Sequence, residues 1–139
     1  FLLIDLDGFK GLNDSLGHHR GDEVLKQVGL MMQDICRDID VAARYGGDEF
    51  CILLPHADLD ATLQVGRRLV SRFYEEVETW DLGDTKLGIS VGASHRSLCG
   101  VSDPEELVRQ ADEAMYAAKR QGVGLMLHTG SKVSHLQVA

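Results

Sequence analysis

Apolar residues recur along this chain at the spacings of strands and of amphipathic helices, and their order outlines a fold. Five apolar runs bounded by turn-forming or charged residues predict strands, at residues 1–7, 40–45, 50–55, 86–93 and 125–128. Three longer stretches have apolar residues every three or four positions and predict helices, at residues 22–39, 59–77 and 104–121. The closely spaced second and third strands must pair antiparallel. We therefore expect an α/β fold of the α+β sandwich type, with helices flanking a central mixed, largely antiparallel sheet.

Capping residues mark the ends of two of these helices. Asp58 is a good N-cap for the middle helix. Asp103 followed by Pro104 gives an N-cap and a proline at the first helical position, and Gly122 is suited to end the same helix.

Composition and charge narrow the class of protein. With 139 residues, of which 44% are hydrophobic and 26% charged, the chain fits one domain, which we place at residues 1–128 with a polar C-terminal tail at 129–139. The formal net charge of -8 argues against non-specific nucleic-acid binding. No apolar run could span a bilayer, and the cysteines, an odd number without CxxC spacing, are expected to be reduced core residues. We expect a cytoplasmic domain, which a missing N-terminal region could attach to a membrane.

The segment that joins the second and third strands carries two adjacent acids, in the sequence Arg44–Phe50. Gly46 and Gly47 predict a tight β-hairpin turn, because glycine readily adopts the positive φ that such turns need. Asp48 and Glu49 then begin the next strand, where consecutive side chains point to opposite faces, so the two acids should have different roles. Taken alone, the segment is more typical of an exposed hairpin tip.

Two aspartates at the end of the first strand strengthen the case for a functional site. Asp5 and Asp7 lie two residues apart and should face the same side of the sheet, where burial is costly unless they are paired or bind a metal. The following segment, residues 8–14, has two glycines and Lys10. It either holds an anion with its backbone N–H groups or is a plain loop that enters a helix. His18 and His19 are more typical of surface or packing residues, and we assign them no metal.

If the first strand and the hairpin are neighbours, Asp5 and Asp48 converge. Proteins usually hold Mg²⁺ with two carboxylates and a backbone oxygen, together with phosphates of the substrate. Lys10 and Lys119 could offset the charge of a triphosphate. Asn13 and Asp22 offer mixed donor and acceptor groups that suit a guanine edge. The residues alone therefore predict a metal-dependent nucleotidyl transferase without specifying its product.

Three segments in this order resemble the GGDEF family of diguanylate cyclases, whose fold is similar to the palm of nucleotidyl cyclases and polymerases. They read IDLDGFKGLNDSLGHHRGDEVL (Ile4–Leu25), RYGGDEF (Arg44–Phe50) and ADEAMYAAK (Ala111–Lys119). The resemblance covers nearly the whole chain in order and spacing. It also implies a segment before Phe1 that is not in this sequence, including the family's Leu-Thr-Gly-Leu element, and an N-terminal sensory domain as partner.

The resemblance implies that two GTP molecules condense to cyclic di-GMP and release pyrophosphate, with Mg²⁺, or else Mn²⁺, as cofactor. The metal ligands it implies are Asp5, the Leu6 carbonyl, Asp48 and Glu49, and the catalytic residues are Asp48, Glu49 and Lys10. The substrate-binding residues it implies are Asn13 and Asp22 for guanine, and Phe9, Lys10, Gly46, Gly47 and Lys119 around the phosphates. Which acid is the general base stays open. Each domain holds one GTP, so two copies must meet face to face as a homodimer.

A second implied site would bind the product as an inhibitor. Arg37 and Asp40 match the family's RxxD motif, and Arg68 is in register to assist them; without the resemblance we would interpret them as a helix-ending arginine and a turn aspartate. One departure is that the family's Gly-Arg-Asn after the last helix is here Gly122–Gly124 with Val123 in the middle, which should weaken GTP binding. The alternatives are a catalytically inactive receptor for cyclic di-GMP or GTP, and a purely dimerising or regulatory remnant.

Overall fold

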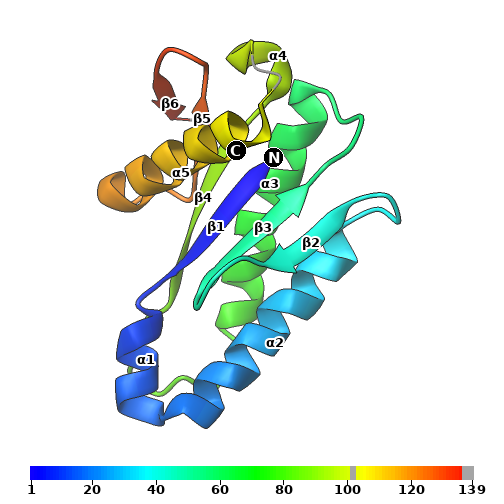
Figure 1. The fold of residues 1–139 in the computed structure, drawn as a ribbon. Helices are drawn as coiled ribbons and strands as arrows, with labels where there is room; N and C mark the ends of the chain where they lie inside the picture. The colour runs from blue at the N-terminus through cyan, green and yellow to red at the C-terminus, as the bar shows by residue number, and fades with distance from the viewer. Residues whose placement is uncertain (101–102, 136–139) are drawn as a thin grey trace.

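The first strand, β1 (Leu2–Asp7), lies at the centre of a six-stranded sheet. In this computed structural model, which describes residues 1–100 and 103–135, the strand order is β2-β3-β1-β4-β5-β6 (Figure 1). The remaining strands are β2 (Val41–Arg44), β3 (Glu49–Leu53), β4 (Gly88–Ser94), β5 (Leu125–His128) and β6 (Val133–His135). Strands β4 and β5 pair in parallel, whereas the other neighbours pair antiparallel. The expected mixed, largely antiparallel sheet is confirmed.

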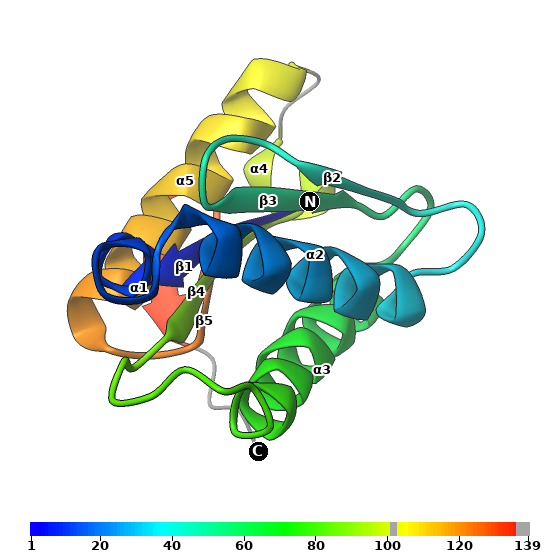
Figure 2. The same cartoon turned by 90° about the horizontal axis from the view of Figure 1, so that it is seen from below.

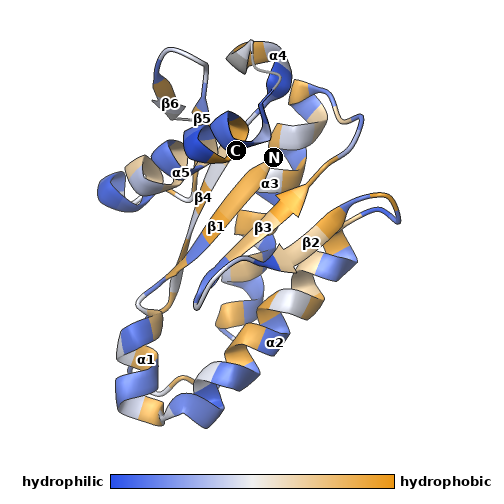
Figure 3. Ribbon diagram, in the orientation of Figure 1, coloured by the Kyte–Doolittle hydropathy of each residue, from blue (hydrophilic) through white to orange (hydrophobic). Residues whose placement is uncertain are grey.

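Helices cover both faces of this sheet (Figure 2). Helices α2 (His18–Ile35) and α3 (Leu59–Val77) lie on one face, and α5 (Pro104–Gln121) lies on the other. Alternate residues of β1 serve the two layers, because Leu2 and Ile4 belong to the large core cluster while Leu3 packs against α5. Figure 3 shows the resulting apolar colouring of β1 and β3 between helices that are polar on their outer sides. The sandwich architecture follows from this two-sided burial.

The capping residues of α3 and α5 act as the sequence predicts. The Asp58 side chain accepts a hydrogen bond from Ala61 N–H at 2.7 Å. The Asp103 side chain accepts one from Glu105 N–H at 3.0 Å, and Gly122 adopts φ 65° after the last turn of α5. Among the described residues, no helix is long and apolar enough to cross a bilayer.

The region before α2 differs from the prediction. Residues expected to form a glycine-rich loop form helix α1 (Phe9–Leu16), and α2 begins at His18 rather than Asp22. Gly17 separates the two helices because its φ of 84° cannot continue a helix. Helix α2 also ends early, at Ile35, and Ile39 is 55% exposed instead of facing the core.

The hairpin is confirmed, but the reason given for its glycines is wrong. Neither Gly46 nor Gly47 is among the residues with positive φ. The turn is longer than a two-residue type, since the N–H groups of Tyr45 and Gly46 both donate to the Glu49 carbonyl, at 2.8 and 3.1 Å. A Cβ on Gly46 would lie 2.8 Å from Glu49 Oε2, so glycine is needed there for space.

Other differences lie outside the predicted elements. A short helix, α4 (Arg96–Cys99), follows β4. The segment expected to be a polar tail contributes β6, which pairs with β5, while residues 136–139 lie outside the described residues. Cys36 and Cys51 are free thiols but only half-buried; the side chain of Cys99 lies outside the described structure.

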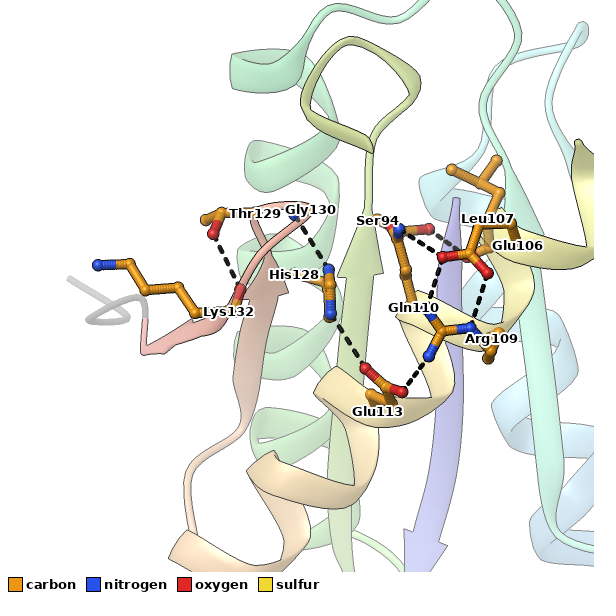
Figure 4. Close-up of polar contacts among 10 residues, drawn as sticks. All are labelled: Ser94, Glu106, Leu107, Arg109, Gln110, Glu113, His128, Thr129, Gly130 and Lys132. Atoms are coloured by element: carbon orange, nitrogen blue, oxygen red, sulfur yellow. Dashed lines mark hydrogen bonds and ion pairs between the residues drawn. The ribbon is translucent and has the colours of Figure 1, made fainter. Parts of the chain in front are cut away.

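A cluster of polar contacts, built on the buried His128 and Ser94, holds the N-terminal half of α5 on the sheet (Figure 4). His128 of β5 is 5% exposed, and its Nε2 lies 3.1 Å from Glu113 Oε2 while its Nδ1 accepts from Gly130 N–H at 3.0 Å. On the same face of the sheet, Ser94 of β4 donates to the Leu107 carbonyl at 2.7 Å. These contacts fix the helix that carries Lys119 toward β1.

Candidate functional site

The hairpin tip lies directly beside the end of β1. Asp5 pairs with Glu49 in the register between β1 and β3. One residue further on, the Leu6 N–H donates to the Asp48 carbonyl at 3.1 Å. The strand pairing therefore brings the backbone of the tip alongside Asp5 and Leu6, with Glu49 opposite Asp5 and Asp48 opposite Leu6.

Lys119 reaches this point from α5. Its Nζ lies 2.5 Å from Asp5 Oδ2 and 3.5 Å from Asp7 Oδ1. Asp5 is only 8% exposed, so the ammonium neutralises a carboxylate that would be costly to bury alone. The hydrogen bond with Asp5 raises the pKa of Lys119 above its ordinary value. Asp7 accepts a second hydrogen bond from Ser90 Oγ at 2.7 Å.

Glu49 and Asp48 open onto different cavities. Glu49 lines a cavity of about 490 Å³ between the hairpin and α5, together with Tyr45 and Asp112. Burial raises the pKa of Glu49, and the charges of Asp5, Asp48 and Asp112 raise it further. A carboxylate in such surroundings holds a proton more readily than one in water, which suits it to accept a proton in a reaction.

The cavity beside Asp48 gathers most of the remaining candidate residues. It has a volume of about 430 Å³, and its lining comes from α1, the start of α2 and the hairpin: Phe9, Lys10, Asn13, Asp14, His18, Asp22, Leu25, Arg44, Gly47 and Asp48. A larger cavity of about 840 Å³ lies around Phe1, Pro55 and His95 and is lined by none of the candidate site residues. Of the substrate residues expected from the sequence, Gly46 and Lys119 do not line the cavity beside Asp48.

The N-terminus of α1 forms one wall of the cavity beside Asp48. Gly8 precedes the helix with φ 86°, and a Cβ there would lie 2.7 Å from the Lys86 carbonyl oxygen. No side chain caps the helix, so its first N–H groups, at Phe9 and Lys10, lack an acceptor within the helix. Such a helix start attracts anions, and the Lys10 ammonium adds a full positive charge.

Asn13 packs closely against a glycine of α2, Gly21. A Cβ on Gly21 would lie 1.9 Å from Asn13 Oδ1 and 3.2 Å from Phe9 Cζ. Asn13 Oδ1 is buried and has no hydrogen-bond partner among the described residues. A buried acceptor without a partner is costly unless a ligand supplies a donor. No sequence signal distinguishes Gly21 from the other glycines of α2.

Arg44 stabilises the turn that carries Asp48. Its Nε lies 3.0 Å from the carbonyl oxygens of both Gly46 and Gly47, and its Nη2 lies 2.7 Å from that of Gly47. The sequence alone assigns no role to this arginine. In the sequence, this role is indicated by an arginine that closely precedes two glycines, because no side chain shields the glycine carbonyls.

The donor set beside the tip fits a hard cation. Asp5 and Asp48 offer carboxylate oxygens, and the intervening backbone offers the Leu6 carbonyl, which are the oxygen ligands that Mg²⁺ prefers. Within the described ranges, no three His, Cys, Asp or Glu side chains are arranged to hold a metal ion. A cation here would thus take few ligands from the protein and the rest from water and phosphate.

The three residues of the expected inhibitory site meet at the far end of α2. Arg37 Nη2 lies 2.8 Å from Asp40 Oδ1, and its backbone N–H donates to Asp40 Oδ2 at 2.8 Å. The Asp40 side chain is 1% exposed, and its hydrogen bonds from Arg37 hold the pKa of the carboxyl below its usual value. Arg68 Nη2 donates to the Ile35 carbonyl at 2.8 Å. The guanidinium of Arg37 is half exposed at this corner.

Val123 lies beyond the last turn of α5. It is half-buried and packs with Ala114, Ala118 and Met126. Its N–H donates to the Ala118 carbonyl at 3.0 Å. The valine therefore serves packing in this chain.

Comparison with known proteins identifies close relatives of this arrangement. The model of the family described as "Diguanylate cyclase, GGDEF domain" matches residues 1–124. Diguanylate cyclase DosC of Escherichia coli K12 is 42% identical over 122 residues, which cover 87% of this chain and 26% of DosC. Response regulator PleD of Caulobacter vibrioides is 37% identical over 122 residues, which cover 87% of this chain and 27% of PleD. The chain spans about a quarter of the length of these curated relatives.

Solved structures share the fold. The active GGEEF domain of a diguanylate cyclase from Vibrio cholerae superposes with a TM-score of 0.80 at 30% identity, covering 91% of this chain and 80% of that one. The GGDEF domain of DgcB from Caulobacter crescentus, solved in complex with c-di-GMP, gives a TM-score of 0.77 at 25% identity, covering 94% of this chain and 77% of that one.

Proposed function

Because the chain belongs to the GGDEF family of diguanylate cyclases, we propose that the protein that carries it condenses two GTP molecules to cyclic di-GMP and releases pyrophosphate. The observation that carries this proposal is the cavity beside Asp48, which brings Lys10 and the N-terminus of α1 together with Asn13 and Asp22. One end suits a phosphate chain and the other a guanine.

The residues of the cavity divide the substrate between them. The first N–H groups of α1 and the Lys10 ammonium bind the phosphates, and Lys119 contributes a second ammonium near Asp5. Asp22 accepts from the donors of the guanine edge, and the unpartnered Asn13 Oδ1 accepts another. Both positions are set by α1 and α2, so the base is read by rigid elements.

Each condensation step forms a bond between a ribose 3′ oxygen and the α-phosphorus of the other GTP, and it breaks the bond from that phosphorus to the leaving pyrophosphate. The 3′-hydroxyl must lose its proton. The raised pKa of Glu49 and its position apart from Asp48 favour Glu49 as the acceptor. Asp5, Asp48 and the Leu6 carbonyl would hold Mg²⁺, which supplies charge stabilisation on the phosphates, and Glu49 is a further possible ligand.

Two copies of the domain must cooperate, because the proposed cavity holds one nucleotide and the reaction consumes two. A two-fold arrangement that presents the two cavities to each other satisfies this requirement. An N-terminal sensory region is the expected partner that brings the copies together.

The direct test is turnover by the full-length protein. Incubation at micromolar concentration with GTP and Mg²⁺ should yield cyclic di-GMP and pyrophosphate, detected by chromatography and mass spectrometry. A complete lack of product under these conditions would overturn the proposed activity. Replacing Mg²⁺ with excess chelator should stop the reaction, and Mn²⁺ should restore it.

Two observations support a second candidate function, that of a receptor that senses cyclic di-GMP without making it. Arg37, Asp40 and Arg68 gather at a corner remote from the cavity beside Asp48, and Val123 replaces the arginine typical of the family. Calorimetry that shows binding of cyclic di-GMP together with no GTP turnover would select the receptor. Binding of either nucleotide would exclude a purely regulatory remnant.

A further inference from the structure

His18 lies at the guanine end of the cavity beside Asp48, although the sequence analysis gave it no role. It is the first residue of α2, and its side chain lines the cavity with Asn13 and Asp22. His18 and Asp22 are four residues apart on the same helix, so their side chains share one face. The imidazole forms no hydrogen bond or ion pair with any residue that the structure describes.

The neighbouring histidine has a different environment. His19 is 92% exposed at its side chain, lies 3.5 Å from Glu23 Oε1 and does not line the cavity. One helical step of about 100° separates the two side chains, which turns His19 away from Asn13. The pair therefore provides a functional candidate and its natural control in adjacent positions.

A guanine needs more than the acceptors assigned so far. Its N1–H and N2–H₂ groups are donors, which Asp22 and Asn13 Oδ1 can satisfy, but its O6 and N7 atoms are acceptors and need a donor. Arg44 already donates to the carbonyls of Gly46 and Gly47, and Lys10 lies at the phosphate end, in the first turn of α1. The amide nitrogen of Asn13 can serve one of these acceptors, and the imidazole of His18, which has no partner among the described residues, can serve the other.

We propose that His18 donates a hydrogen bond to O6 of the bound guanine, the acceptor that adenine lacks, and so contributes to the choice of guanine as base. This inference rests on the proposed function of the cavity and adds a specificity residue to it. An adenine would present its N6–H₂ donor where guanine presents O6, and two donors would then face each other.

Binding of GDP isolates the effect from turnover, because GDP carries the same base and cannot release pyrophosphate. Calorimetry on the full-length protein should show His18→Ala weakening GDP binding about fivefold, the effect of one hydrogen bond. His19→Ala should leave the dissociation constant unchanged. His18→Gln, which keeps a donor, should restore part of the affinity.

Base analogues locate the bond. 7-Deaza-GDP lacks N7, and 6-thio-GDP has a poor acceptor in place of O6. 6-Thio-GDP should bind the unsubstituted protein more weakly than GDP does, and this penalty should vanish in His18→Ala. A penalty confined to 7-deaza-GDP would place the bond on N7, which adenine shares, and would overturn the contribution to base choice. An unchanged GDP affinity in His18→Ala, or penalties that persist in that variant, would overturn the role of His18 alone. Failure of the unsubstituted protein to bind GDP or GTP would overturn the proposed function with it.

Discussion

Asp48 is positioned by its backbone, which leaves its carboxylate available. Its carbonyl accepts from the Leu6 N–H, and the turn before it is held by Arg44. Because the fold does not use the Asp48 side chain for these contacts, a change confined to its charge should affect chemistry more than stability.

Asp48→Asn should therefore lower turnover by about 100-fold or more, since removal of a direct metal ligand should cost at least as much as loss of an outer-shell contact. The melting temperature should stay close to that of the unsubstituted protein. Cyclic di-GMP formation at saturating Mg²⁺ measures the loss, and Asp60→Asn, which changes an exposed aspartate in the first turn of α3, is the matched control. A near-normal rate in Asp48→Asn would contradict the metal role.

The substitution of glycine by alanine should have opposite effects on stability at two positions of α2. Gly21→Ala places a Cβ 1.9 Å from Asn13 Oδ1, whereas Gly29→Ala meets no atom within 4 Å. The first should displace Asn13 and weaken GTP binding roughly tenfold, with some loss of stability. The second should stabilise the protein by roughly 0.5–1 kcal/mol, because alanine is favoured over glycine inside a helix.

Thermal melts and nucleotide titrations of both variants test this contrast. Equal nucleotide affinity for Gly21→Ala and Gly29→Ala would show that Gly21 does not position Asn13.

At the scale of elements, the turn after α2 contains an ion pair formed by two residues of the expected inhibitory site, Arg37 and Asp40. Arg37 closes on Asp40 through both its backbone and its side chain. Its Nη2 also donates to the Pro55 carbonyl at 3.2 Å, which joins the turn to the end of the hairpin. A product that binds here would exchange part of these contacts for its own phosphates.

Arg37→Ala should abolish inhibition by added cyclic di-GMP and leave the initial rate within about twofold, because the residue lies outside the cavity beside Asp48. The measurement is turnover as a function of added product. Arg72→Ala, which removes an exposed arginine paired with Glu76, should inhibit like the unsubstituted protein. Inhibition that is equally strong in Arg37→Ala would refute this site.

Asp40 should also give stability a defined pH dependence. Its pKa is lowered in the folded protein from an ordinary value of 3.8, so its ionised form stabilises the fold above that pH. The contribution is lost as pH falls through the lowered pKa. Asp40→Asn should melt a few degrees lower at pH 7, and the difference should shrink below pH 3.8. A difference that is constant with pH would show that the charge does not matter.

Some of these elements can be predicted from the sequence and others cannot, for physical reasons. Asp58 and Asp103 define helix starts because a cap is a local interaction. Helix α1 escaped prediction because only Phe9 and Leu12 of its residues are buried, too few to show a helical period. Within the site, strand alternation predicts the separation of Asp48 from Glu49, but the contact of Gly21 with Asn13 depends on how two helices pack.

At the scale of the whole molecule, the site is divided between two cavities on either side of the hairpin. The cavity beside Asp48 is lined by α1 and α2, and the cavity beside Glu49 is lined in part by α5. In the proposed reaction, the nucleotide bound in one copy would meet the proton acceptor of a second copy across the hairpin tip, so assembly would be part of catalysis.

If the reaction needs two copies, as proposed, specific activity should rise with protein concentration until dimer formation is complete. Rates per chain measured from nanomolar to micromolar protein, with sedimentation to follow mass, test this expectation. A constant rate per chain in a range where sedimentation shows monomers would contradict it.

The sheet order has a consequence for synthesis on the ribosome. Strand β1 precedes the hairpin, yet it needs β4 as its second neighbour, and Asp5 meets Lys119, 114 residues later. A nascent chain that has emerged only as far as the hairpin holds most of the site's acids but lacks the lysine that neutralises one of them and the helix that covers their face. Contacts so distant in sequence form late, so the buried carboxylate of Asp5 gains its partner only after α5 has followed the hairpin out of the ribosome.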